Sequence, residues 1–267
     1  MKILLLDAYN LIHRARSGFK GGDYPVVYNF FRGLRPLVEK FNPDKVYFVL
    51  EGYPKFRKTI NTDYKSNRKS QDRRFYEQKA QIISLIKACF PFDVVRHPDL
   101  ECDDTIATLV KIHCSKGDQC TIVSSDSDFY QLLNLFEGCE IYNPIKKTHI
   151  ETPDYDYVTW KALRGDATDN IKGIPGCGDK TALKLVTNKD LLAEYLRIDD
   201  RQKIFENNVN LIRLVDFSQN MTELESHAGT RNWEELHAVF CEMEFNSMVK
   251  EKTWNNFIRT FNNLGSG

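Results

Sequence analysis

The sequence predicts an α/β protein with a central, mostly parallel sheet and a second, helical region. Short apolar runs within 2–7, 45–51 and 120–124 lack the alternation of a half-exposed strand, which is typical of parallel strands buried on both faces. Helical patterns separate these runs, and strands that alternate with helices indicate a parallel sheet. After 140–142 the alternation stops, and the remainder of the chain is mostly helical.

The composition is that of an ordinary globular protein. Hydrophobic residues make up 42% of the 267 residues and charged residues 28%; Lys+Arg and Asp+Glu balance at 37 each, so net charge indicates no partner. No apolar run approaches membrane-span length, and Asp7 interrupts the first run too early for a signal peptide. The seven cysteines form no C-x-x-C pair, and their odd number argues against a disulfide framework. We therefore expect a reducing compartment.

Three predicted strands end in carboxylates. Asp7 ends the first, Glu51 ends the second, and Asp126 and Asp128 follow the strand at 120–124. A helix cap at Asp7 or a polar turn at Asp126 would explain one of these residues, but not the whole set. Because the ends of parallel strands gather at one edge of a sheet, where ligands usually bind, we expect these side chains to lie together.

A further acidic group, Glu101, Asp103 and Asp104, precedes a helical apolar pattern. If the helix begins near Asp99, all three lie in its first turn, where the helix N-terminus favours negative charge by about 0.3–1 kcal/mol per group. That contribution does not offset the mutual repulsion of three close carboxylates. Either water solvates them or a hard cation binds them through oxygen. Together with the acidic strand ends, the group favours the cation.

Residues 55–79 are strongly basic in a chain that is neutral overall. Nine basic residues stand against three acidic ones, which gives this segment a charge of about +6. Basic groups attract phosphates, and aromatic faces stack on unpaired bases. A solvated basic helix is the alternative, but the interleaved aromatic residues favour nucleic acid. These aromatic residues are Tyr53, Phe56, Tyr64, Phe75 and Tyr76.

A glycine-rich stretch in the helical region follows two more carboxylates. Asp166 and Asp169 lie three residues apart, and the run 173–180 then opens a helix. A glycine-rich turn at a helix start directs backbone N–H groups at an anion, and Lys180 and Lys184 add positive charge. A tight turn between two helices would need the same glycines, so this motif alone leaves both interpretations open.

In order and spacing, these motifs resemble the structure-specific 5′ nuclease family, which includes phage flap endonucleases and exonucleases and the 5′-nuclease domain of bacterial DNA polymerase I. The resemblance runs at least from 7 to 186. It implies a PIN-like α/β nuclease core over 1–150 with a helical arch at about 53–80. It also implies a helical DNA-binding region over 151–267 with a helix–three-turn–helix at about 160–187. Two residues depart from the family pattern: Glu51 replaces the usual Asp, and Cys102 stands where Ala is common.

The resemblance also implies two Mg²⁺ ions, for which Mn²⁺ substitutes, and a K⁺ ion at the helix–three-turn–helix. It implies catalytic roles for Lys65, Arg68 and Asp128, and stacking of Tyr64 on a base beside the cut. The implied ligands of the first metal are Asp7, Glu51, Glu101 and Asp103, and those that hold or orient the second are Asp104, Asp126, Asp128 and Asp169, with Asp166 in an outer shell. The implied nucleic-acid contacts are Arg57, Tyr64, Lys65, Arg68, Gly173, Gly176, Gly178, Lys180 and Lys184.

The activity implied by the resemblance is metal-dependent hydrolysis of phosphodiesters in 5′-flap or branched DNA and at 5′ ends. The expected protein is a monomer that binds DNA junctions or 5′ ends, and no membrane, in the cytoplasm of a bacterial or phage-infected cell. Removal of RNA primers from an RNA–DNA hybrid is an alternative. A non-catalytic junction-binding protein is another, which Glu51 keeps open. A small-molecule phosphatase is disfavoured because it would have no use for the basic, aromatic segment.

Overall fold

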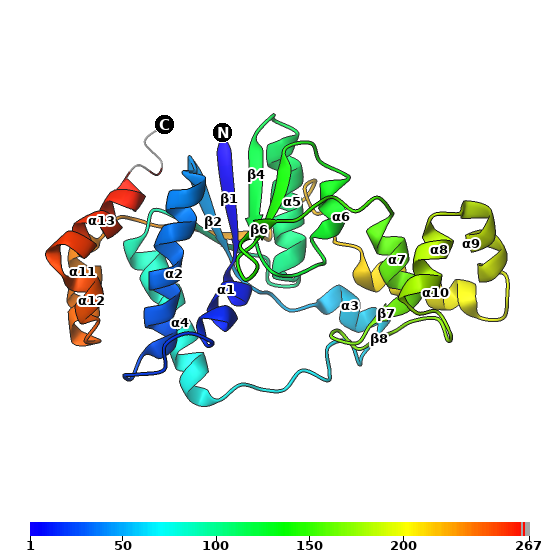
Figure 1. Ribbon diagram of the computed structural model, residues 1–267, viewed down its shortest axis with the longest axis horizontal. Coiled ribbons are helices and arrows are strands. Elements are labelled where there is room, and N and C mark those ends of the chain that lie inside the picture. Colours follow the sequence, from blue (N-terminus) through cyan, green and yellow to red (C-terminus); the bar gives the residue numbers. More distant parts are fainter. Residues whose placement is uncertain (263, 265–267) are drawn as a thin grey trace.

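A seven-stranded sheet forms the centre of the protein in the computed structural model, which describes residues 1–262 and 264 (Figure 1). The strand order is β6-β5-β4-β1-β2-β3-β9; the five central strands are parallel and the two edge strands antiparallel. The predicted α/β class is therefore confirmed. The strands are β1 (Lys2–Asp7), β2 (Lys45–Val49), β3 (Asp93–Arg96), β4 (Gln119–Val123), β5 (Cys139–Asn143), β6 (Thr148–His149) and β9 (Glu225–Ala228).

Strand register brings the predicted acidic ends to one edge of the sheet. In β1, Asp7 pairs with Val49 of β2, and Leu6 pairs with Val123 of β4. The residues that follow Val49 and Val123 therefore leave the sheet beside Asp7. The apolar residues of β1 are fully buried because helices cover both faces of the sheet, as expected for a parallel strand.

Two hydrophobic clusters lie on opposite faces of the sheet. Leu4 and Leu6 join the larger cluster, whereas Ile3 and Leu5 join the smaller one, as the period-2 alternation of a strand requires. The larger cluster contains α1 (Ala8–Ala15), α2 (Pro25–Phe41) and α4 (Arg73–Cys89), and the smaller one contains α5 (Cys102–Cys114) and α6 (Tyr130–Leu133).

A separate group of helices extends from the sheet at the right of Figure 1 and has its own two hydrophobic clusters. A two-stranded antiparallel hairpin, β7 (Gly165–Asp166) with β8 (Ile171–Lys172), connects its first helix to the glycine-rich turn. The helices are α7 (Tyr157–Arg164), α8 (Asp179–Val186), α9 (Lys189–Leu196) and α10 (Arg201–Ile212), and α3 (Lys55–Ile60) packs on α10.

The last part of the chain returns to the sheet, which corrects the expectation of one helical region over 151–267. Strand β9 pairs with β3, and α11 (Trp233–Glu242), α12 (Asn246–Val249) and α13 (Glu251–Asn262) lie beside α2 and α4 (Figure 1). The cause is an apolar stripe: Phe240 packs against Phe31, and Phe261 against Phe90. None of the helices in the described part of the chain combines the length and apolarity needed to cross a membrane.

The basic segment, expected to form a helical arch, is helical only at its two ends. Helix α3 stops at Ile60, residues 61–72 form turns and irregular backbone, and α4 begins after Asp72 (Figure 1). Asn, Asp and Ser are frequent in this stretch, and their side chains compete with helical hydrogen bonds. Asp72 then starts α4 by accepting the Phe75 N–H at 2.8 Å.

Candidate active site

The acidic group before α5 forms a helix cap. Glu101 is the N-cap residue and α5 begins at Cys102, later than the start near Asp99 that we expected. Glu101 and Asp104 make a capping box, in which the Glu101 backbone N–H donates to the Asp104 carboxylate at 3.1 Å. The cap fixes both carboxylates at the buried start of the helix.

Arg57 is the internal partner of this cap. Its side chain is 3% exposed and donates to Glu101 at 2.9 Å and to both Asp104 oxygens at 2.6 and 2.8 Å, while Nε donates to the Leu211 carbonyl at 2.7 Å. Asp104 is fully buried and also accepts the Val215 N–H at 2.8 Å. The expectation that Arg57 contacts nucleic acid is therefore wrong. Asp104 holds Arg57 and is not available as a direct metal ligand.

Lys65 and Arg68 reach the carboxylates from the segment between α3 and α4. The Lys65 ammonium donates to Glu101 and lies 3.5 Å from Asp169, and Arg68 donates to Asp169 at 2.8 Å. The Lys65 backbone has a φ of 56° and its N–H donates to the Asp169 carbonyl at 3.0 Å, so this strained turn is tied to the β7–β8 hairpin. Two cations of the basic segment thus lie within the acidic site.

Tyr64 does not present a face for base stacking, and that expectation is wrong. Its side chain is 3% exposed, and its hydroxyl contacts Glu101 at 3.1 Å and Asp169 at 3.2 Å. Burial raises the pKa of this phenol, so it stays a neutral donor between two carboxylates. The exposed aromatic rings here are Phe56 and Tyr76 of the basic segment, at 46% and 44%, and Tyr53 just before it, at 57%.

Four carboxylates at the sheet edge form what we call the uncompensated group: Asp7, Glu51, Asp103 and Asp126. Across residues 1–262 and 264, none of their carboxylate oxygens has a Lys, Arg or His side-chain nitrogen within 4.0 Å. Asp7 accepts from Ser124 at 2.7 Å and from the Asn10 N–H at 3.0 Å. Glu51 accepts the Cys102 N–H at 3.3 Å. Among the described residues, the donors to the side chains of Asp7, Glu51 and Asp126 are neutral.

Burial and mutual repulsion raise the pKa values in this group. Burial and then the charge of Asp126 raise the pKa of Asp7 to about 6, and burial and then the charge of Glu101 raise the pKa of Glu51 to about 7. Burial and Asp126 also hold the pKa of Asp103 well above its ordinary value. Such a set binds either protons or a cation.

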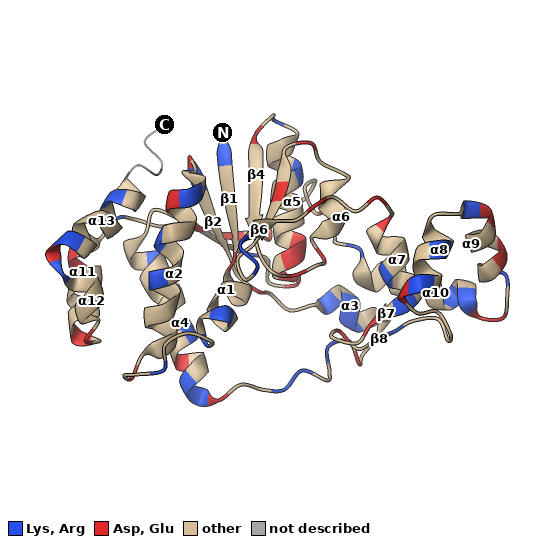
Figure 2. Ribbon diagram, in the orientation of Figure 1, with Lys and Arg blue, Asp and Glu red and all other residues tan. Residues whose placement is uncertain are grey.

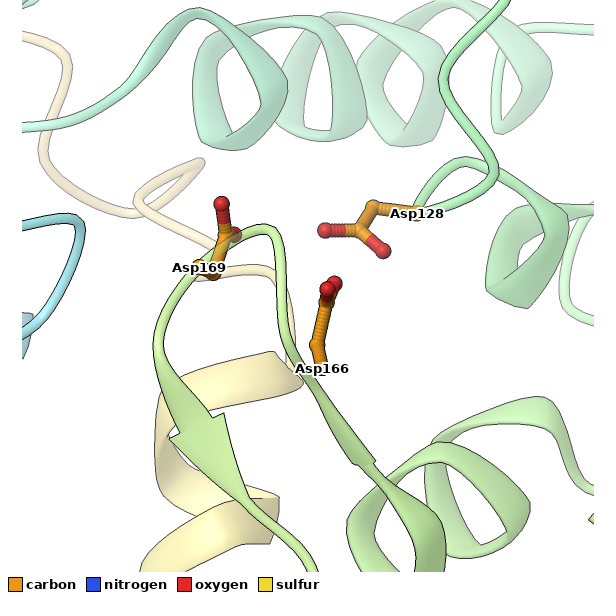
Figure 3. A group of neighbouring side chains, drawn as sticks. All are labelled: Asp128, Asp166 and Asp169. Atoms are coloured by element: carbon orange, nitrogen blue, oxygen red, sulfur yellow. The ribbon is translucent and has the colours of Figure 1, made fainter. Parts of the chain in front are cut away.

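A second set, which we call the compensated triad, consists of Asp128, Asp166 and Asp169. Each offers an oxygen, and these oxygens all lie within 4.8 Å of one another. Figure 3 shows Asp128 on a loop opposite the hairpin that carries Asp166 and Asp169. Burial raises the pKa of Asp128 to about 6. Burial also acts to raise the pKa of Asp166, but hydrogen bonding from Lys161 holds it below its ordinary value.

Lys161 is the functional residue that the sequence interpretation missed. It lies on α7, is 3% exposed, and donates to Asp128 and, at 2.6 Å, to Asp166. A signal was present in the sequence, because Lys161 falls on the apolar stripe of the helix with Tyr157, Val158 and Ala162. A lysine on the buried face of a helix requires an anionic partner.

The glycine-rich turn follows β8 and opens α8. Gly165 has a φ of 80°, and a Cβ at Gly173 would lie 2.2 Å from the Arg164 carbonyl oxygen. Glycine is therefore required at both positions. Gly178 is the N-cap of α8, and Lys180 and Lys184 are exposed on that helix. The geometry provides an exposed helix start with cationic neighbours, and the contact of these residues with nucleic acid stays a prediction.

The charges of the site are segregated over the molecule. Figure 2 shows acidic segments where the sheet meets α5, and basic segments along α3 and the chain that leads to α4.

Two models of one family match this chain: "5′-3′ exonuclease, N-terminal resolvase-like domain" over 2–161 and "5′-3′ exonuclease, C-terminal SAM fold" over 152–244. The chain belongs to the 5′-3′ exonuclease family. This confirms the family resemblance of the sequence motifs.

Relatives of this 5′-3′ exonuclease family member include bacterial DNA polymerases I. The thermostable DNA polymerase I of Thermus thermophilus is 29% identical over 280 residues, which cover 94% of this chain and 33% of the relative. DNA polymerase I of Bacillus subtilis is 27% identical over 284 residues, or 93% of this chain and 32% of the relative. The chain thus spans about a third of the length of these relatives.

Solved structures share the fold at low sequence identity. A bacteriophage T5 flap endonuclease complex with DNA and metal ions has a TM-score of 0.64 at 18% identity, covering 97% of this chain and 99% of that one. T5 5′-exonuclease with bound zinc has a TM-score of 0.63 at 18% identity over the whole of both chains. Human GEN1 with Holliday junction DNA has a TM-score of 0.55 at 17% identity, covering 97% and 72%.

Proposed function

We propose that this protein is a metal-dependent 5′ nuclease that hydrolyses phosphodiesters in 5′-flap or branched DNA and at 5′ ends. The observation that carries the proposal is the meeting of the uncompensated group and the compensated triad beside Lys65 and Arg68. Membership of the 5′-3′ exonuclease family supports it. The similar T5 flap endonuclease was solved with DNA and metal ions, which also supports it.

The donor set fits hard divalent cations. Every carboxylate at the sheet edge offers oxygen, and Mg²⁺ prefers oxygen ligands and retains several waters. We propose that Asp7, Glu51, Asp103 and Asp126 hold one Mg²⁺ ion, and that Asp128, Asp166 and Asp169 hold a second, with Mn²⁺ able to replace either. Bound divalent ions supply the charge that activates water near neutral pH and stabilises the reacting phosphate. Glu101 then serves to orient Lys65 and Arg57.

The chain's own cations would bind and orient the phosphate. Lys65 and Arg68 hold Glu101 and Asp169 through contacts that a phosphate oxygen can replace, since phosphate and carboxylate are both oxyanions. Arg68 is half exposed, so its guanidinium can turn toward a substrate while its backbone stays in place. Positive charge placed beside the reacting phosphate stabilises the charge that develops there.

The glycine-rich turn and α8 would bind the duplex next to the cut. Backbone N–H groups at Gly176 and Gly178, with Lys180 and Lys184, suit a phosphate backbone, and a K⁺ ion held at this turn would add positive charge for the phosphates. Contacts of this kind fix the position of DNA without reading its sequence. We propose that the protein acts as a monomer on DNA junctions in the cytoplasm of a bacterial or phage-infected cell.

One cleavage experiment tests the proposed function. The protein is incubated with a 5′-flap DNA, a nicked duplex and an RNA–DNA hybrid, each in Mg²⁺ and in EDTA. We expect Mg²⁺-dependent cleavage near the junction of the flap DNA, and Asp128→Asn should abolish cleavage while it retains DNA binding. Cleavage of the hybrid alone would favour primer removal. Binding without cleavage of any of the three substrates would indicate a junction-binding protein and refute the proposed nuclease activity.

A further inference from the structure

The two carboxylate sets differ in how their charge is balanced. Among the residues that the structure describes, no basic side-chain nitrogen lies within 4.0 Å of a carboxylate oxygen of the uncompensated group. In the compensated triad, by contrast, Lys161 contacts Asp128 and Asp166, and Arg68 and Lys65 contact Asp169. The first set therefore attracts any cation, whereas the second already contains cations that belong to the chain.

Lys161 differs from the other two cations because it cannot turn into solvent. Its side chain is 4% exposed, compared with 13% for Lys65 and 50% for Arg68. Its ammonium lies between oxygens that come from two different elements, the loop after β4 and the strand β7. Those oxygens belong to the three carboxylates that approach within 4.8 Å of one another. The ammonium thus occupies the place where the triad would also bind a divalent ion.

We propose that Lys161 is an internal counter-ion that competes with the second divalent cation for Asp128 and Asp166. This inference rests on the proposed function, because it concerns the second of the two cation sites. A buried ammonium beside the same two carboxylates repels an incoming divalent ion and occupies part of its ligand sphere. The uncompensated group then fills first, and the triad fills only at higher metal concentration.

The test is calorimetric titration of Mn²⁺ into the DNA-free protein, with three chains compared. Lys161→Met keeps most of the side-chain volume and removes the charge. Lys172→Met is the matched control, because Lys172 lies on the neighbouring β8 with an exposed side chain. In the unmutated protein we expect one tight and one weaker site. Lys161→Met should tighten the weaker site by about tenfold or more, with the tight site unchanged. Lys172→Met should change neither.

The opposite effect on the weaker site would refute the proposal. If Lys161→Met leaves the weaker site unchanged, or weakens it, Lys161 only supports the structure and does not compete with the metal. Melting temperatures of the variants, measured in EDTA and in Mn²⁺, show whether each variant folds. Lys161→Met should melt below the unmutated protein in EDTA, because two buried carboxylates lose their cation, and Mn²⁺ should raise its melting temperature by more than it raises that of the unmutated protein. An equal or smaller rise would overturn the proposal.

Failure of this inference differs from failure of the proposed function. If the unmutated protein cleaves flap DNA in Mg²⁺ while Lys161→Met shows no tighter second site, only the competition is wrong. If the unmutated protein binds no Mn²⁺ at all, both the nuclease and the competition are wrong. Substitution by arginine gives a last check, since Lys161→Arg keeps the charge and should not tighten the second site.

Discussion

Replacing Arg57 distinguishes a structural role from a DNA-binding role. The first role predicts a loss of stability, and the second predicts a change in the salt dependence of DNA binding. Arg57 connects α3 to the start of α5 and to the chain after α10. It makes three hydrogen bonds to two buried carboxylates, Glu101 and Asp104. Arg57→Met keeps much of the packing but leaves Asp104, which is fully buried, with backbone donors only.

The expected loss is large because one partner of a buried ion pair is removed. Such a change costs about 3–5 kcal/mol, since a buried charge remains without its partner. For a protein of this size, that corresponds to a fall in melting temperature of roughly 6–20 °C. Urea unfolding, followed by circular dichroism, measures the change in the free energy of unfolding directly.

Lys55→Met on the same helix is the control. Lys55 pairs with Asp99 at 2.6 Å, but the two side chains are 65% and 40% exposed, so solvent screens the pair and it contributes little to stability. The salt dependence of DNA binding supplies the second measurement, because a lost phosphate contact lowers its slope by about 1. A stability loss below about 1 kcal/mol for Arg57→Met, together with a reduced salt slope, would show that Arg57 contacts DNA and that the buried pairing is wrong.

Three further changes test other parts of the site. Lys65→Met should lower turnover by about 10²–10³ with a smaller effect on duplex affinity, measured in single-turnover cleavage; a change confined to affinity would make Lys65 a tether. Lys180→Ala should weaken DNA binding and reduce its salt slope, whereas an unchanged slope would place this lysine away from phosphate. In EDTA, Glu51→Gln should stabilise the protein at pH 8 but not at pH 4. The folded pKa of Glu51, about 7, lies above its unfolded value, so the folded state loses stability as pH rises between the two values. A gap between the urea midpoints of Glu51→Gln and the unmutated protein that does not change with pH would contradict this account.

The sheet and its acidic edge could be predicted because each depends on local pattern. Unalternating apolar runs identify strands buried on both faces, and the residue that ends such a strand is visible in the sequence. Asp7 and Glu51 therefore reach the predicted edge, and the register of β1 with β2 explains why they lie together. The acidic start of α5 was also predicted, with an error of about one helical turn in where the helix begins.

The direction of side chains in the basic segment could not be predicted, because tertiary pairing decides it. In the sequence, Arg57 and Arg68 are alike, and so are Tyr64 and Tyr76. Arg57 turns inward where α3 packs on α10, and Tyr64 turns inward into a hydrophobic cluster with residues of α7 and α10. Arg68 and Tyr76 stay in contact with solvent. The return of the chain through β9 was equally hidden, since its four residues are all exposed and show no strand alternation.

If the protein binds metal and DNA as proposed, the balance of charge at the site should couple the two. Lys65 and Arg68 now neutralise Glu101 and Asp169, and a phosphate that takes up these cations leaves those carboxylates with less positive charge nearby. A divalent cation bound beside these carboxylates would restore that positive charge. Conversely, a divalent ion held by the triad would weaken the pairing of Asp169 with Arg68 and free the guanidinium for phosphate. Coupling between two ligands is reciprocal, so each should increase the affinity of the other. The exchange of Lys65 and Arg68 between carboxylate and phosphate should therefore favour a complete complex of metal and DNA over either partial one.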